Sequence, residues 1–137
     1  MKNNKLMTSR EEDLMNVFWN QEEPMAITDI IELLDKEQWN QVTLFRIVKK
    51  LLDKGYLEIY GFKKNNTQYA RKFIPSLTKE EYAAVLLSER GIESNSLANI
   101  ALAMLGGNKR KEVCEEEKNY LIHELENIIK QIKKQGE

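Results

Sequence analysis

The chain has 137 residues and a formal net charge of −1, from 21 Lys and Arg against 22 Asp and Glu. This length allows one domain or two small ones, with a core large enough to fold without disulfides or a metal. The single cysteine, Cys114, excludes an internal disulfide and multi-cysteine metal sites. No apolar run approaches the ~20 residues of a membrane span, and no signal sequence precedes the charged segment. We therefore expect a cytoplasmic protein.

The charges are distributed unevenly along the first 75 residues. Residues 1–40 carry four basic and nine acidic side chains, whereas residues 41–75 carry eight basic and two acidic ones. Such a local patch matters more to a polyanion than the net charge, because salt screens each charge within about 10 Å. Residues 41–75 are thus a candidate surface for nucleic acid, although an ordinary solvated face has the same composition.

Two short helices are predicted before this basic segment. Ser9 and Glu12 match a capping box, which predicts a helix over about 10–20. A second apolar stripe at helical spacing predicts a helix over about 28–36, with Thr28 as its N-cap. The stripe consists of Ile27, Ile30, Ile31 and Leu34.

The third predicted helix spans about 41–54, with Asn40 as N-cap and Gly55 as the C-terminal stop. One face of this helix is apolar: Leu44, Ile47, Val48, Leu51 and Leu52. The opposite face is mostly basic, and two apolar side chains, Val42 and Phe45, also point away from the core. The helix therefore has one face for packing and one face for a partner.

After Gly55 the hydrophobic period changes from 3.6 to 2. Residues 56–60 and 68–73 are predicted strands, and the polar link 61–67 is rich in turn residues. The pair should form an antiparallel hairpin whose tip carries Lys63 and Lys64.

The remainder of the chain is predicted to be helical. Thr78 and Glu81 form a second capping box ahead of a helix over about 79–90. A short apolar helix begins near Leu97 and stops at Gly106, and a long helix covers about 113–134. The long helix has a 4-3-4 apolar seam, typical of lengthwise packing on another helix: Leu121, Leu125, Ile128 and Ile132.

Three short helices followed by a hairpin predict a winged helix-turn-helix over residues 1–75 and a helical region over 76–137. The fold class is mostly α with a small β-hairpin. The major groove admits one helix, so the helix over 41–54 would read DNA while the hairpin contacts the backbone. The polar base-reading candidates are Gln41, Thr43 and Arg46, and those for thymine methyl groups are Val42 and Phe45. The phosphate-contacting candidates are Lys49, Lys50, Lys54, Lys63 and Lys64.

The segments TSREEDLMNVFWN and WNQVTLFRIVKKLLDKG are similar to two motifs of the penicillinase repressors of the BlaI/MecI type and the related CopY repressors. The matching positions are Glu11, Met15, Trp19, Trp39, Thr43, Leu51, Lys54 and Gly55, with Tyr69 and Pro75 further along. The resemblance is good over about residues 7–90, and holds only in helical outline beyond them.

The resemblance implies a homodimeric transcriptional repressor that binds an inverted repeat in double-stranded DNA. Its C-terminal helices would build the dimer, and the candidate dimerisation residues are Leu97, Ile100, Met104, Leu121, Leu125, Ile128 and Ile132. A sensor-protease that cuts at an Asn-Phe bond is a candidate partner in the family. The chain contains no Asn-Phe pair and no C-x-C motif, so proteolytic control and copper sensing are both unsupported.

Two alternatives stay open beside the repressor. One is a winged helix that docks a protein partner through Val42 and Phe45, and the other is a regulator that binds a small molecule between its domains. An enzyme is disfavoured, because catalytic motifs are absent and the chain has one His and one Cys. We expect no catalytic residues, no cofactor, no metal and no membrane partner. Trp19 and Trp39 are interpreted as packing residues, and His123 as a surface or interface residue.

Overall fold

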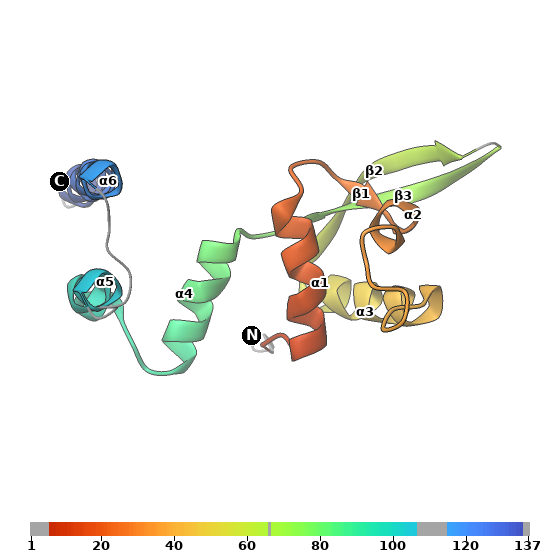
Figure 1. Ribbon diagram of the computed structural model, residues 1–137, viewed down its shortest axis with the longest axis horizontal. Helices are drawn as coiled ribbons and strands as arrows, with labels where there is room; N and C mark the ends of the chain where they lie inside the picture. The colour runs from red at the N-terminus through yellow and green to blue at the C-terminus, as the bar shows by residue number, and fades with distance from the viewer. Residues whose placement is uncertain (1–5, 66, 107–114, 136–137) are drawn as a thin grey trace. The chain divides into compact units, whose positions relative to one another are not determined.

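The computed structural model describes residues 6–65, 67–106 and 115–135. The chain forms two compact units, Met1–Gly91 and Ile92–Glu137. The elements of the first unit are α1 (Ser9–Asn20), β1 (Met25–Ala26), α2 (Ile27–Ile31), α3 (Gln41–Lys54), β2 (Leu57–Asn65), β3 (Gln68–Pro75) and α4 (Lys79–Glu89) (Figure 1). Those of the second are a 3-10 turn (Ser94–Ser96), α5 (Leu97–Gly106) and α6 (Glu115–Gln135). The predicted fold class is confirmed.

The first helix begins one residue earlier than predicted. Thr8 is the N-cap: its side chain accepts a hydrogen bond from the Glu11 backbone N–H at 3.2 Å, and Oε1 of Glu11 accepts one from the Thr8 N–H at 2.9 Å. The predicted capping box of Ser9 and Glu12 is therefore wrong. The sequence TSREE contains two overlapping matches to the motif, and the structure uses the first, which buries Glu11.

The second helix is shorter than predicted, because its flanking residues have other backbone partners. Residues Met25–Ala26 form β1, a strand that the sequence analysis missed, and Ala26 rather than Thr28 caps α2. After Ile31 the backbone continues in tighter turns of the 3-10 type, because the N–H groups of Leu33 and Leu34 donate hydrogen bonds to the carbonyls three residues back. The predicted helix over 28–36 is thus confirmed only in its first turn.

The third helix matches its prediction at both ends. The Asn40 side chain accepts a hydrogen bond from the Thr43 N–H at 2.8 Å, and Gly55 ends the helix in the left-handed region at φ 85°. The apolar face is buried at Leu44, Ile47, Val48 and Leu51, and Leu52 is half-buried. The opposite face of α3 is left to solvent.

The sheet is antiparallel with strand order β1-β3-β2. The strands of the hairpin are longer than predicted, because residues 61–65 of the expected link pair with 68–72. The pairing shifts between Ile59 and Gly61, so that Tyr60 lies at a bulge. As a result the hairpin extends well beyond the helices (Figure 1).

Helix α4 packs on the core of the first unit through Tyr82. The Met7 N–H donates to the Tyr82 hydroxyl at 2.9 Å, and the ring of Tyr56 meets that of Tyr82 edge to face at 5.5 Å between centres. Trp19 also belongs to this packing, and its Nε1–H donates to the Leu77 carbonyl at 3.0 Å. The compact unit therefore extends to Gly91, beyond the boundary at residue 75 that we expected from the end of the hairpin.

The second unit is built differently. Within the described parts of α5 and α6, no side chain is fully buried. Helix α6 carries Glu115, Glu116 and Glu117 in its first turn and Lys133 and Lys134 in its last, which complements the helix dipole. Nowhere in the described residues does a helix combine the length and apolar character of a membrane span.

Candidate nucleic-acid interface

The solvent-facing side of α3 carries most of the residues predicted to read DNA. Six of the eight predicted α3 residues are exposed, and Lys54 and Thr43 are half-buried; the exposed ones are Gln41, Val42, Phe45, Arg46, Lys49 and Lys50. Thr43 is half-buried, and its backbone N–H is bound by the Asn40 cap. Val42 and Phe45 expose 78% and 52% of their surface, so two apolar side chains lie among cations on one outward face.

A side chain of α1 holds the turn before α3 in place. The guanidinium of Arg10 lies 4.4 Å from the centre of the Trp39 ring and donates to the Gln38 carbonyl. Trp39 is 6% exposed, in agreement with the packing interpretation. Arg10 therefore positions the N-terminus of α3, a role that the sequence analysis missed because it depends on a contact between segments almost 30 residues apart.

The β2–β3 hairpin is the wing of the winged helix, and the two lysines predicted at its tip have different environments. Nζ of Lys63 lies 2.5 Å from Oδ1 of Asp29 in α2, and this hydrogen bond is the main reason why the Asp29 pKa is lowered. Lys64 is exposed, and its side chain projects from the opposite face of β2, because successive strand residues alternate. Lys63 anchors the wing to α2, while Lys64 is free to contact an external partner.

The hairpin face that carries Lys64 also holds three residues that the sequence analysis did not select: Phe62, Tyr69 and Arg71. Phe62 pairs with Arg71 and Lys64 pairs with Tyr69, and paired residues in an antiparallel ladder project from the same side. Only the strand register, including the bulge at Tyr60, reveals this arrangement. The alternation of the sequence alone does not locate the bulge.

This face of the hairpin is turned toward α3. Arg71 and Phe73 of β3 line a groove of about 610 Å³ together with α3 residues. The α3 residues are Val42, Phe45, Arg46, Val48, Lys49, Leu52 and Asp53. The outward face of α3 and the inner face of the wing therefore form one continuous basic and aromatic surface, which we call the reading surface.

The family comparison agrees with this geometry. A model of the penicillinase repressor family matches residues 7–131, nearly the whole chain. The chain belongs to the penicillinase repressor family. Membership makes it a DNA-binding transcriptional repressor, which is not an enzyme class. No protein of curated function shows significant sequence similarity to it. Within the described residues, no three His, Cys, Asp or Glu side chains lie together as metal ligands, and Cys114 lies outside them.

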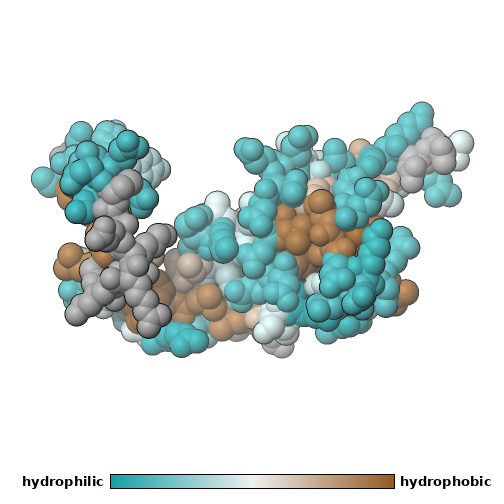
Figure 2. Space-filling model, viewed as in Figure 1, coloured by the Kyte–Doolittle hydropathy of each residue, from teal (hydrophilic) through white to brown (hydrophobic). Residues whose placement is uncertain are grey.

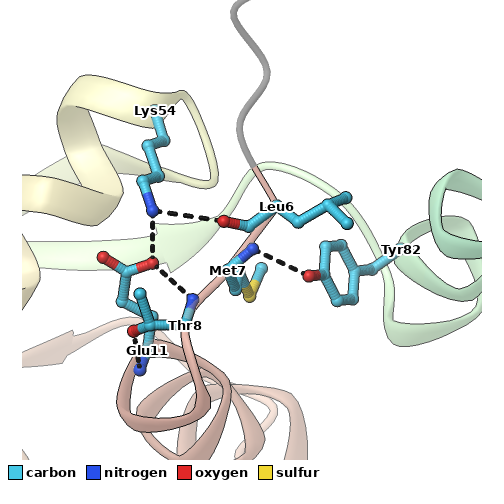
Figure 3. A network of polar contacts seen from close by, with 6 residues as sticks. All are labelled: Leu6, Met7, Thr8, Glu11, Lys54 and Tyr82. Carbon is cyan, nitrogen blue, oxygen red and sulfur yellow. Dashed lines mark hydrogen bonds and ion pairs between the residues drawn. The ribbon is translucent and has the colours of Figure 1, made fainter. Parts of the chain in front are cut away.

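Two positions of the penicillinase repressor resemblance meet inside the fold (Figure 3). Glu11 of the opening motif is 1% exposed, and its carboxylate accepts a hydrogen bond from Nζ of Lys54, at the end of α3, at 2.6 Å. Nζ of Lys54 also donates to the Leu6 carbonyl at 3.3 Å. Lys54 was expected to contact phosphate, but its charge is engaged within the fold.

The Glu11 carboxylate is held in its charged form by this network. Burial alone would raise its pKa, but the hydrogen bonds from Lys54 and from the Thr8 backbone, with the positive charges of Lys54 and Lys50, lower the pKa below its ordinary value. A buried carboxylate that joins α1, α3 and the N-terminal segment fixes the C-terminal end of the reading helix, as Arg10 fixes its start.

Proposed function

We propose that this repressor acts as a homodimer on an inverted-repeat operator, with α3 in the major groove and the β2–β3 wing on the adjacent backbone. The observation that carries the proposal is the reading surface, where exposed cations and apolar side chains of α3 lie beside the basic inner face of the wing. A duplex can engage both kinds of side chain, since cations attract phosphates and apolar groups contact thymine methyl groups.

Each residue of the reading surface has a separate role in the proposal. Gln41 and Arg46 contact base edges, because they are exposed on the first half of α3, and Thr43 assists from its half-buried position. Val42 and Phe45 contact thymine methyl groups. The phosphate contacts come from Lys49, Lys50, Lys63, Lys64 and Arg71, with Lys63 limited by its pair with Asp29.

The C-terminal unit supplies the dimer in this proposal. Its helices expose a large amount of apolar surface, of which a small part is visible at α5 in Figure 2. The large apolar side chains of these helices that are more than half exposed are Leu97, Leu102, Met104, Tyr120, Ile122, Ile129 and Ile132. Of the predicted seam, Leu121 and Leu125 are half-buried and line a hollow together with Leu105, whereas Ile128 and Ile132 are exposed. An unpaired surface of this kind is typical of an interface with a second copy.

In this proposal, repression depends on the dimer holding together two α3 helices that each bind DNA weakly on their own. Two α3 helices held roughly 34–36 Å apart fit successive half-sites on one side of the duplex. The first contact raises the effective concentration of the second reader, so that the dimer binds much more tightly than either half. A bound dimer blocks transcription, and separation of the dimer releases it.

The test is a mobility-shift titration of the full chain against its own upstream DNA and a scrambled duplex, at two salt concentrations. We expect its own DNA to bind tighter by about 10³ or more, with two chains per site. Equal, weak and fully salt-sensitive binding to both duplexes would contradict sequence-specific reading at that site.

A second candidate function is supported by the exposure of Val42 and Phe45, because two apolar side chains that are 78% and 52% exposed on one face can also bury their surface against a protein partner. The winged helix would then dock a protein partner through these residues. Phe45→Ala discriminates between the two. It should weaken partner binding without affecting DNA in this case, and should weaken operator binding in the repressor case.

A further inference from the structure

We propose that the groove between α3 and β3 binds planar aromatic carboxylates, and that a bound carboxylate competes with DNA. The competition rests on the proposed function, whereas the binding site does not. The groove measures about 610 Å³, within the range of cavities that hold small organic ligands. It lies entirely inside the N-terminal unit, and not between the units.

The floor of the groove is apolar and recessed. Val48 and Phe73 line it although they are only 3% and 2% exposed, and the half-buried Leu52 lies beside them. Phe45 on α3 and Phe73 on β3 contribute one aromatic ring from each of the two elements that form the groove. A flat aromatic ring matches such a lining, because aromatic groups pack well in offset-stacked or edge-to-face arrangements.

The rim of the groove is cationic. Its charged lining residues are the cations Arg46, Lys49 and Arg71 and a single carboxylate, that of Asp53, so the formal charge of the lining is +2. In the described part of the chain, the ion pairs engage Lys54 and Lys63, and neither lines this groove. The three cations therefore have no carboxylate partner there, and an anionic group on the ligand supplies one.

Arg71 has the position of the anchoring residue. Its guanidinium lies 5.8 Å from the centre of the Phe73 ring, and therefore close to the apolar floor. A guanidinium presents paired N–H donors that match the two oxygens of a carboxylate. A molecule with its ring on the floor thus places its carboxylate toward Arg71.

DNA does not satisfy the floor of this groove. A duplex presents phosphates and sugars to the cationic rim, and its bases lie flat against protein only after leaving the stack, which costs free energy. Arg46 and Lys49 serve both the rim and the outward face of α3, so a carboxylate bound there removes charge from the reading surface. Occupancy of the groove should therefore release DNA.

The experiment uses the full chain and two probes with the same rings, 2-naphthoate and the uncharged 2-naphthalenemethanol, with binding followed by two-dimensional amide NMR in the absence of DNA. We expect naphthoate to bind about tenfold more tightly than the alcohol, with shifts at α3 and β3, because a charged hydrogen bond is at stake. Equal binding of the two probes, or no binding, would overturn the site.

Two variants on the same strand provide the matched test. Arg71→Gln should weaken naphthoate binding by about tenfold, whereas Lys72→Gln, which removes the same charge from the opposite face of β3, should change it by less than about twofold. Equal losses would show that general charge attraction holds the probe, and would overturn the assignment of Arg71.

The competition is measured separately, by the anisotropy of a labelled upstream duplex with and without naphthoate. We expect naphthoate to raise the apparent Kd for DNA, and unchanged DNA affinity at saturating naphthoate would overturn the competition. Failure of DNA binding in the absence of the probe would count against the proposed function alone, since the NMR titration requires no DNA.

Discussion

The two units of the chain show the same helical periodicity with opposite results. In the N-terminal unit the apolar stripes of α1 and α3 meet, so that Leu14, Phe18, Leu44 and Leu51 are at most 2% exposed. In the C-terminal unit α6 has an equally regular stripe, yet Ile132 is 58% exposed. Periodicity therefore indicates that a face will be buried, but not whether its partner lies in the same chain.

The difference also separates the two tasks of the repressor. The N-terminal unit buries its own core and fixes both ends of α3, through Arg10 with Trp39 and through Glu11 with Lys54. Its reading surface is thus preorganised by one chain. The C-terminal unit leaves about 1.5–3 kcal/mol of hydrophobic stabilisation unrealised for each large aliphatic side chain that stays exposed. In the proposed dimer, the second copy would bury these side chains.

The largest effect should come from breaking the proposed dimer. Leu125→Asp places a charge in the apolar seam of α6, so we expect a dimer-to-monomer change and a loss of about 10²-fold or more in operator affinity, as linked readers become independent. Light scattering after size exclusion and mobility shift measure the two effects. His123→Asp introduces the same charge on the opposite side of α6 and should leave both unchanged. A monomeric Leu125→Asp with full operator affinity would sink the linked-reader mechanism.

A second variant tests the buried network of the N-terminal unit. Lys54→Met leaves the Glu11 carboxylate buried without its partner, so we expect a loss of about 3 kcal/mol in the free energy of unfolding. Urea denaturation measures it. The double variant Glu11→Leu/Lys54→Met removes the buried charge as well and should recover most of the loss. A single variant as stable as the wild type would show that the pair contributes nothing.

The same network predicts an acid dependence of stability. The Glu11 pKa is lowered from its ordinary 4.5 in the folded state, so its contribution is fully present above pH 4.5 and is lost as the pH falls through the lowered folded value. The melting temperature of the wild type should therefore decrease more steeply below pH 4.5 than that of the double variant. Parallel curves for the two proteins would contradict the direction of the shift.

Local signals predicted the elements whose ends are fixed by neighbouring residues. Asn40 and Gly55 bound α3 as expected, and Thr78 with Glu81 opens α4. The prediction for α2 was right only in its first turn, and β1 was missed because it forms only when Met25 and Ala26 pair with Phe73 and Lys72, almost 50 residues away. A two-residue strand has no periodicity of its own from which it could be recognised.

The candidate site was predictable on the helix and less so on the hairpin. One hundred degrees per residue is enough to place Arg46 and Lys49 opposite the core. On the hairpin, the bulge at Tyr60 decides on which face Phe62 lies. Arg71 was missed because its place beside α3 depends on a contact between elements that are far apart in the sequence. Lys54 was misassigned for a related reason, since the carboxylate that binds it comes from another helix.

A third test sharpens the roles within the reading surface. Arg46→Ala should weaken binding to the upstream DNA by about 1–3 kcal/mol while non-specific binding changes less, because a base contact is lost. Lys64→Ala should weaken both kinds of binding alike and lower the salt slope by about one, as expected of a phosphate contact. Titrations of each variant against specific and scrambled duplexes measure this. Equal effects of both variants on scrambled DNA would count against Arg46 as a base reader.

The smallest expected effect concerns the anchor of the wing. Asp29→Asn keeps an oxygen that accepts the hydrogen bond of the Ala26 N–H, now at 3.0 Å, but removes the charge that binds Lys63. Because the pair is partly exposed, stability should fall by less than about 1 kcal/mol. The released lysine should instead raise the salt slope of DNA binding by up to about one. Glu32→Gln, a nearby exposed carboxylate, provides the control for the change in net charge. An identical slope in the two variants would contradict the release of Lys63 toward phosphate.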